Sequence, residues 1–313
     1  MLSDILLPGV VLQSRDLYCE WHIPNNSEGL RANATYFGNA GWAQEYLDFC
    51  HRDAHFRSRW LAAGGDWTGK TVIDLGCGPG NVFATLGGQP RLLVGVDVAA
   101  GSLELAARQG YTAVLADAAH TPFRSEVADI VVINASLHHC DDMHAVLREG
   151  ARLVKPGGLL ITDHDPQLTA WDYKGLAKFM WDARLWVYRV TRHGFHKTGS
   201  QQSWGLRTEI HHRPGDGVTR EFFTSTLAPL GFDVRVHAHN HQIGADALRG
   251  QVGPAHWKYR MGNALSGRDP GASASALSLM CIAKKGGDER LPAGMRMTRP
   301  ASADRTVAAR EMA

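Results

Sequence analysis

Short apolar runs alternate with helical or turn-rich segments between residues 71 and 163. The runs that we interpret as strands cover residues 71–76, 92–98, 112–117, 129–135 and 159–163. Two of the connections, 101–110 and 141–154, have helical patterns, with Ser102 as a candidate N-cap of the first and the sequence KPGG directly after the second. Strands that alternate with helices of this length predict a parallel sheet with helices on both faces.

The remaining segments differ in residue composition and in hydrophobic periodicity, and these differences divide the chain further. Residues 1–70 carry helical periodicity from Trp42 to Leu61, which Gly64-Gly65 ends. Residues 164–218 are rich in Trp, Arg and His without a strand pattern, so we interpret them as an inserted cap. The alternation then returns in 219–286, with a predicted helix (219–231), two predicted strands (232–240 and 276–285) and a second insertion (241–275). The polar tail, 287–313, is predicted to be disordered.

The sharpest local feature is the sequence DLGCGPGN at residues 74–81. A predicted strand enters a glycine-rich turn and then a helix, which is typical of sites for nucleotide-like cofactors. The dinucleotide fingerprint GxGxxG requires glycine where this chain has Asn81, and Asp74 would repel a pyrophosphate but attract a cationic ligand. Asp97 and Asp117 end the next two strands, where they can accept hydrogen bonds from ribose hydroxyls and from an adenine amine. These features disfavour a nicotinamide enzyme.

These motifs, in this order, resemble those of the class I S-adenosylmethionine-dependent methyltransferases of the small-molecule type. The resemblance is carried by DLGCGPG (74–80), GVDV (95–98), LAD (115–117), NASLHHCDD (134–142) and LVKPGGLLITD (153–163). It covers residues 71–163 by sequence and 219–286 by topology. It implies a Rossmann-like, doubly wound α/β fold with a seven-stranded sheet whose last strand is antiparallel, plus helical cap insertions. It also implies S-adenosylmethionine as the cofactor.

The resemblance gives each motif residue an expected role. Asp74 and the loop residues Gly76, Cys77, Gly78 and Gly80 would hold the methionine end of the cofactor. The other expected contacts are Asp97 and Val98 at the ribose, Asp117 and Ala118 at the adenine, Asn134 and Ala135 beneath the sulfonium, and Tyr36 as a lid. Turn geometry or helix capping could explain any one of these residues alone, but their combination favours a cofactor site.

Histidines that follow the strands are the candidate groups on the acceptor side, because ligands of open α/β sheets lie beyond the carboxyl ends of the strands. We take His138, His139, His164 and His239 as candidate catalytic residues, with His164 as the leading base. His241, on the same strand face as His239, is a candidate substrate contact. Packing or helix capping would explain the same histidines without chemistry. A divalent ion held by Asp163, His164, Asp165 and the histidines is a competing interpretation, but no ligand spacing is diagnostic and we predict no metal.

The cap is basic and aromatic. Arg207, Arg213 and Trp181 are candidate substrate-binding residues for an apolar or aromatic acceptor that carries a carboxylate or phosphate. The simpler alternative is an amphipathic helix over 170–192 with buried aromatic side chains and solvated arginines.

Composition narrows the classes of function. The chain has 33 Lys+Arg and 31 Asp+Glu, a formal charge of +2, which excludes a strongly basic nucleic-acid coat. No NPPY-type motif or Pro-Cys nucleophile of nucleic-acid methyltransferases is present. The five cysteines are widely spaced without a CxxC pair, which argues against a zinc ribbon and a secreted disulfide framework. No apolar stretch is long enough for a membrane helix, and the N-terminus lacks the basic region of a signal peptide.

We therefore expect a cytoplasmic methyltransferase that acts on a small-molecule acceptor. Nucleic acid is an unfavoured partner, no membrane contact is expected, and a homodimer and a role in specialised metabolism are both compatible with the sequence. The acceptor atom (O, N or C) is not readable. RNA or protein methylation remains an alternative, as does a cyclase-like or binding-only protein on the same fold.

Overall fold

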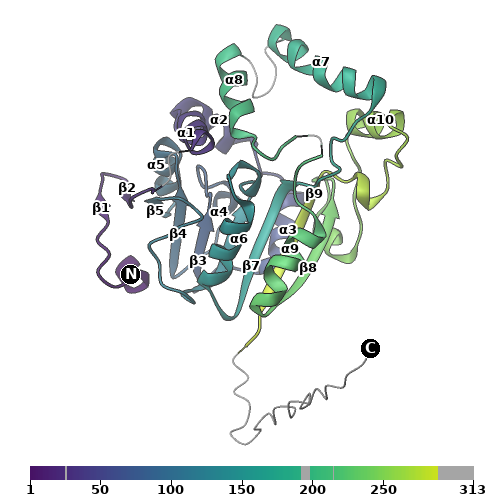
Figure 1. The fold of residues 1–313 in the computed structure, drawn as a ribbon. Helices are drawn as coiled ribbons and strands as arrows, with labels where there is room; N and C mark the ends of the chain where they lie inside the picture. The colour runs from purple at the N-terminus through teal and green to yellow at the C-terminus, as the bar shows by residue number, and fades with distance from the viewer. Residues whose placement is uncertain (25–26, 192–197, 214, 288–313) are drawn as a thin grey trace, which may run out of the picture.

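The computed structural model describes residues 1–24, 27–191, 198–213 and 215–287, except the side chains of residues 185, 188 and 189. Within this part of the chain, nine strands form one sheet in the order β1-β2-β5-β4-β3-β6-β7-β9-β8 (Figure 1). The strands are β1 (Gln13–Ser14), β2 (Tyr18–Glu20), β3 (Thr71–Leu75), β4 (Leu92–Asp97), β5 (Thr112–Leu115), β6 (Ala128–Asn134), β7 (Val154–Pro166), β8 (Phe232–His239) and β9 (Ser278–Lys285). Strands β2 to β7 pair in parallel, whereas β1 and β9 are antiparallel to their neighbours.

Helices cover both faces of the sheet. The α-helices are α1 (Glu28–Tyr36), α2 (Ala40–Phe49), α3 (Ala54–Gly64), α4 (Asn81–Leu86), α5 (Ala100–Arg108), α6 (Met143–Leu153), α7 (Gly175–Thr191), α8 (Gly199–Thr208), α9 (Arg220–Leu227) and α10 (Trp257–Leu265). Short 3-10 helices are η1 (Leu2–Ile5), η2 (Leu137–His139), η3 (Ala228–Leu230), η4 (Ala245–Arg249) and η5 (Ser273–Ser275).

The central strands supply side chains to two hydrophobic cores, because successive residues of a strand point to opposite faces. Ile73 packs in the core that contains Leu147 of α6 and Phe223 of α9. Its neighbour Val72 packs in the other core, with Trp60 of α3. The buried, doubly covered strands explain the continuous apolar runs of the sequence.

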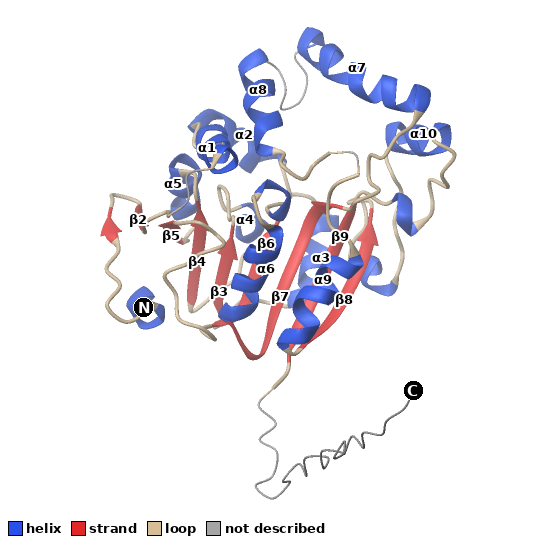
Figure 2. Cartoon of the chain, in the orientation of Figure 1, coloured by secondary structure: helices blue, strands red, loops and turns tan. Residues whose placement is uncertain are grey.

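Helices α1, α2, α7, α8 and α10 gather beyond one end of the sheet (Figure 2). Helix α8 contacts α1, and α7 contacts α10. The N-terminal helices and the inserted cap, which are far apart in the sequence, thus lie beyond the same end of the sheet.

The predicted fold class is confirmed: the parallel strands, the antiparallel last pair and the flanking helices are all present. The seven expected strands form the sheet from β5 to β8, and the N-terminal segment adds two more. Strand β2 extends the sheet because Tyr18 to Glu20 pair in parallel with β5. Residues 13–14 and 18–20 therefore lie at the edge of the sheet.

Other local expectations need correction. The helix expected from Trp42 to Leu61 is two helices, because Asp53 caps α3 by accepting hydrogen bonds from His55 and Phe56 N–H. Ser102 is not the N-cap of α5; it lies inside the helix and donates to the Phe37 carbonyl at 2.7 Å. The sequence KPGG follows the end of α6 as predicted, but it is part of β7.

The cap contains helices, but only part of its aromatic side chains is buried as the amphipathic alternative expected: Tyr173 is buried, whereas two aromatic side chains of α7 are not. Phe179 and Trp186 of α7 are 70% and 68% exposed. Residues 192–197 and 214 of the cap lie outside the described residues, as does the tail from residue 288, so the prediction of a disordered tail stays a prediction. All five cysteines are free. Among the described residues, no helix has both the length and the apolar character that a membrane crossing requires.

Candidate active site

The glycine-rich turn joins β3 to α4 at the carboxyl end of the parallel strands. Gly76 has a φ of 70° and lies so close to the loop after β6 that a Cβ there would be 2.0 Å from Ser136 Oγ. The backbone N–H groups of Gly76 and Cys77 both donate to the Val96 carbonyl, which fixes the turn to the end of β4. Only glycine fits the first position, for reasons of both backbone conformation and space.

Two aspartates lie at the ends of the next strands. Asp97 accepts from Gly78 N–H through Oδ2 at 2.8 Å and from Ala99 N–H through Oδ1 at 2.9 Å. Asp117 accepts from Ala119 N–H through Oδ1 at 2.9 Å. A carboxylate has about four lone-pair positions, so both side chains can accept further hydrogen bonds from a ligand.

A cavity of about 260 Å³ lies between the turn, these aspartates and the N-terminal helices. It is lined by ten of the twelve residues predicted for the cofactor, namely Asp74, Gly76, Cys77, Gly78, Asp97, Val98, Asp117, Ala118, Asn134 and Ala135. Residues distant in sequence are therefore brought together around one space, as the motif order implies.

The other two predicted residues, Gly80 and Tyr36, lie behind the wall. Gly80 faces the Tyr111 ring, which a Cβ would approach to 2.9 Å. Tyr36 is 8% exposed, and burial raises its pKa to about 12. Its ring packs edge-on against Phe37, with centroids 5.0 Å apart, and it is Phe37 that lines the cavity.

Three side-chain oxygens of residues in the cavity wall, on Asp74, Asn81 and Asn134, have no partner among the described residues, and they test whether a cofactor fits. Asp74 accepts from Tyr111 Oη through Oδ2 at 2.8 Å, but its Oδ1 is buried and unpaired, and so is Asn134 Oδ1. Burial raises the pKa of Asp74 to about 7. Buried polar atoms require partners, and the ammonium of an amino-acid moiety has three N–H donors to offer them. The methionine end of S-adenosylmethionine fits this demand.

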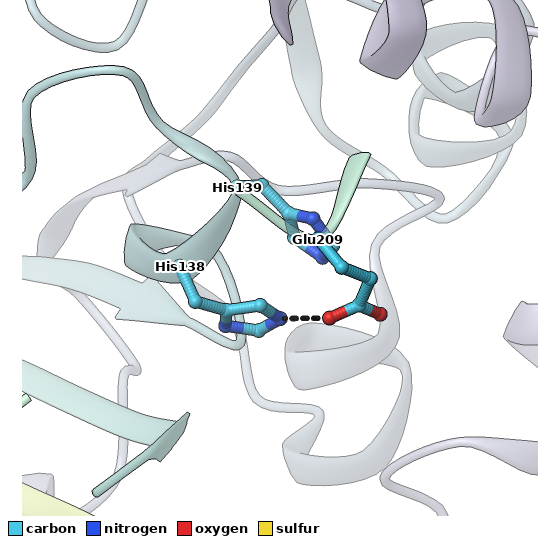
Figure 3. A group of neighbouring side chains, drawn as sticks. All are labelled: His138, His139 and Glu209. Atoms are coloured by element: carbon cyan, nitrogen blue, oxygen red, sulfur yellow. Dashed lines mark ion pairs between the residues drawn. The ribbon is translucent and has the colours of Figure 1, made fainter. Parts of the chain in front are cut away.

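A pair of histidines and a glutamate meet beside the cavity (Figure 3). His139 lines the cavity and its Nδ1 is 2.8 Å from the Thr208 carbonyl, while His138 Nδ1 is 2.9 Å from Asp165 Oδ1. The Nε2 atom of His138 is 3.7 Å from Glu209 Oε2. Burial lowers the pKa of both histidines to about 4, so they are neutral at pH 7.

The other predicted histidines, His164, His239 and His241, lie in a second, deeper cluster and do not themselves line the cavity. His239 Nε2 is 2.7 Å from Asp163 Oδ1, and Arg59 donates through Nε to Asp163 Oδ2 at 3.0 Å, with all three side chains fully buried. Burial alone would raise the pKa of Asp163, but Arg59, His164 and His239 lower it well below its usual value. His164 has a φ of 62°, and its ring is 4.4 Å from the rings of His51 and His241.

His51 is the member of this deeper cluster that lines the cavity. Its Nε2 is 2.9 Å from Tyr46 Oη, and Tyr46 also lines the cavity. His164, the leading base candidate, does not line the cavity. Among the described side chains whose rings contact His164, His51 is the one that lines the cavity.

The residues predicted to bind substrate are dispersed. Arg207 lies over the Trp204 ring at 5.2 Å, beside a separate surface depression, and Arg213 is exposed. His241 belongs to the deeper histidine cluster. Trp181 stacks on Trp171 at 6.1 Å.

Trp181 nevertheless connects to the histidine pair through a row of rings. The Trp171 ring is 4.0 Å from that of His212, which is 5.4 Å from that of His138. An aromatic path therefore leads from helix α7 toward the cavity.

Sequence reasoning missed several wall residues. Phe37 directly follows α1, Tyr46 lies on α2 and His51 lies between α2 and α3, and none of them belongs to a motif that indicates binding. Glu209 was a detectable signal, because acids are rare in the basic cap, but its partners lie about 70 positions away in the sequence and no spacing rule could identify them.

Comparison with known proteins identifies the domain that builds this site. Residues 73–162 match the family model described as "Methyltransferase domain". The malonyl-[acyl-carrier protein] O-methyltransferase of Yersinia pestis is 29% identical over 133 residues, which are 42% of this chain and 49% of that protein. The demethylmenaquinone methyltransferase of Corynebacterium kroppenstedtii is 37% identical over 92 residues, 29% of this chain and 40% of that protein.

Among solved structures, a geranyl diphosphate methyltransferase in complex with GPP and sinefungin is 16% identical with a TM-score of 0.47, covering 83% of this chain and all of that one. The chain spans about half the length of the first curated relatives it matches, 49% and 40% in the two named here. The matched region contains the glycine-rich turn, both strand-end aspartates and the histidine pair. The chain therefore carries a methyltransferase domain of the class I S-adenosylmethionine-dependent family.

Proposed function

We propose that this protein transfers a methyl group from S-adenosylmethionine to a small-molecule acceptor that is aromatic or apolar and carries an anionic group. The observation that carries the proposal is that one cavity is lined by the cofactor motifs and also by aromatic side chains and imidazoles. When bound, S-adenosylmethionine supplies a methyl group on a cationic sulfonium, which is open to in-line attack by a nucleophile.

The chain's own residues would hold the cofactor through complementary polar contacts. Asp97 would accept from the ribose hydroxyls while keeping its bonds to Gly78 and Ala99 N–H. Asp74 and Asn134 would accept from the ammonium group through their unpaired Oδ1 atoms. These contacts orient the cofactor within the cavity, and positioning of the two reactants can supply much of the rate enhancement.

The opposite wall suits an apolar acceptor. Leu30, Phe37 and Tyr46 provide apolar and aromatic surface, and Asn33, His51 and His139 provide a few polar atoms. Pockets for small molecules have this composition, with few polar groups that fix orientation. His139 Nε2 would accept a hydrogen bond from an acceptor hydroxyl or amine, because its Nδ1 donates to Thr208.

Two arginines of the cap are the proposed contacts of the acceptor's anionic group. They are Arg207 and Arg213, but neither lines the cavity in this structure. Replacement of each by glutamine should raise the acceptor KM without lowering cofactor affinity. An unchanged KM in both variants would remove the anionic requirement.

A radiolabel-transfer assay tests the function directly. Purified protein and methyl-labelled S-adenosylmethionine are incubated with hydroxybenzoates, quinols and short acyl thioesters, and in parallel with total RNA and with cellular protein. Label in a small molecule would support the proposal. Label only in RNA or protein would establish the alternative substrate class, and cofactor binding without transfer to any of the three would favour a non-methylating protein.

A further inference from the structure

The histidine pair beside the cavity brings ring nitrogens of two imidazoles close to one carboxylate, because one possible ligand atom from each of His138, His139 and Glu209 lies in the same small region. His138 Nδ1 is engaged by Asp165 and His139 Nδ1 by the Thr208 carbonyl. Since a carbonyl oxygen only accepts, His139 must carry its proton on Nδ1, which leaves the Nε2 lone pair available. An aspartate at 2.9 Å from His138 Nδ1 favours the same tautomer for that ring.

These hydrogen bonds are the kind that orient metal-binding histidines. A ligating histidine commonly donates its other ring N–H to a carboxylate or a backbone carbonyl, which fixes the ring and the tautomer. Asp165 is fully buried and also accepts the His138 backbone N–H at 3.1 Å. Both forms of support, one carboxylate and one carbonyl, are thus built into the fold.

Glu209 completes the set from the other side. It directly follows helix α8, and its carboxylate points toward the His138 ring (Figure 3). One ligand atom from each of His138, His139 and Glu209 lies within 4.8 Å of the other two, and His138 Nε2 is 3.7 Å from Glu209 Oε2. Atoms bound tetrahedrally at ~2.0–2.2 Å from one ion lie about 3.3–3.6 Å apart, so shifts of about an ångström would close the site.

We propose that His138, His139 and Glu209 bind a divalent first-row transition-metal ion, with Zn²⁺ as the best-fitting ion. Two imidazoles and one carboxylate form a ligand set of catalytic zinc sites, which keep positions open for a ligand. Mg²⁺ fits poorly because it requires oxygen ligands. The sequence alone predicted no metal, and its competing metal site combined Asp163, His164, Asp165 and the histidines but did not include Glu209.

The position of the ion beside the cavity would allow it to bind the methyl acceptor, and this role rests on the proposed function. His139 lines the cavity, so an ion on its Nε2 stands next to the acceptor wall. With the ion on His139 Nε2, an oxygen of the acceptor could occupy an open coordination position in place of a hydrogen bond to that nitrogen, and a bound hydroxyl then loses its proton to water more readily. The substrate class narrows to acceptors with a phenolic, enolic or carboxylate oxygen.

The test measures metal binding and needs no enzymatic activity. The full chain is stripped with chelator and titrated with Zn²⁺ by calorimetry and with Co²⁺ by visible absorption. We expect one ion per chain. The variants Glu209→Gln and His139→Gln should weaken binding by more than about 100-fold, and Asp165→Asn by about 10- to 100-fold through loss of ring orientation.

His144→Gln is the matched control, because His144 lies on α6 close in sequence and bonds to Thr226 outside the cluster. Its affinity should equal that of the wild type. Thermal unfolding of each metal-free variant checks that it is folded. If His139→Gln does not fold, the comparison rests on Glu209→Gln, because the Glu209 side chain is only partly buried and its replacement disturbs the fold less.

Absence of Zn²⁺ binding, or equal affinity in the wild type and Glu209→Gln, would overturn the proposal. So would an intense thiolate-to-cobalt band, since it would place the ion on a cysteine such as Cys140. Methyl transfer by stripped protein that binds no Zn²⁺ would refute the ion alone, whereas Zn²⁺ binding without methyl transfer would refute the proposed function alone.

Discussion

Replacement of Asp97 by asparagine removes one charge and keeps the shape of the side chain. In the wild type the two carboxylate oxygens accept from Gly78 and Ala99 N–H at 2.8 and 2.9 Å. An asparagine has one acceptor oxygen and one donor nitrogen, so it can satisfy only one of these N–H groups. The other backbone N–H would face the amide nitrogen of the asparagine, which is also a donor. This repulsion disturbs either the glycine-rich turn, through Gly78, or the start of α5, through Ala99.

The expected loss of affinity follows from the bonds to the ribose. A hydrogen bond to a charged group contributes about 1.5–3 kcal/mol, and a neutral one about 0.5–1.5 kcal/mol. Two ribose hydroxyls would each lose about 1–1.5 kcal/mol, or about 2–3 kcal/mol together. That corresponds to a rise in Kd of about 30- to 150-fold.

Calorimetry with S-adenosylhomocysteine measures this change without dependence on the acceptor. Asp129→Asn is the matched control, because Asp129 accepts a backbone N–H from Thr71 at 2.7 Å and pairs with Lys155, away from the cavity. Its Kd should stay within about twofold. A change of less than about threefold for Asp97→Asn, or an equal loss in both variants, would refute the assignment of Asp97 to the ribose.

Three further results are expected. Gly76→Ala should lower the free energy of unfolding by about 2–5 kcal/mol, because strain at a φ of 70° adds to the close contact with Ser136. The control Gly69→Ala, at a φ of 75° with open space around it, should lower the free energy of unfolding by only about 1–2 kcal/mol. Equal urea midpoints for the two variants would contradict this. Burial lowers the pKa of His239 to about 4, below its unfolded value of ~6.5, so the unfolded chain binds one proton more and the free energy of unfolding should fall as the pH drops from 7 to 5. His239→Asn should reduce this dependence of the free energy of unfolding on pH by up to about 1.4 kcal/mol per pH unit. An unchanged dependence would exclude His239 as a contributor. Phe37→Ala should raise the Kd for S-adenosylhomocysteine or the acceptor KM by about tenfold, through lost aromatic contact with the ligand, and normal values of both would remove Phe37 from the binding wall.

The central sheet was predictable because its strands are buried on both faces. Their apolar runs end in Gly76, Asp97 and Asp117, and the parallel pairing brings these ends to one edge without further information. The short β2 strand was not predictable, since three residues at a sheet edge carry no periodic pattern and are held by pairing with β5.

The acceptor side shows where local patterns stop being informative. Strand-end position predicted one group of histidines, but the backbone turns at His164 and His241, with φ of 62° at each, and directs them into the buried cluster around Asp163. Tyr36 ends α1 and Phe37 directly follows it, and only packing determines that Phe37 lines the cavity while Tyr36 does not. Contacts between the cap and the core, such as that of Glu209 with His138, depend on the tertiary fold.

Calorimetric titration of the purified protein with S-adenosylmethionine, S-adenosylhomocysteine and NADH tests the central claim most directly. The unpaired acceptors at Asp74 and Asn134, together with Asp97 at the end of β4, predict binding of the first two ligands and not of the third. Binding of NADH, or binding of none of the three, would contradict the assignment of this cavity to S-adenosylmethionine.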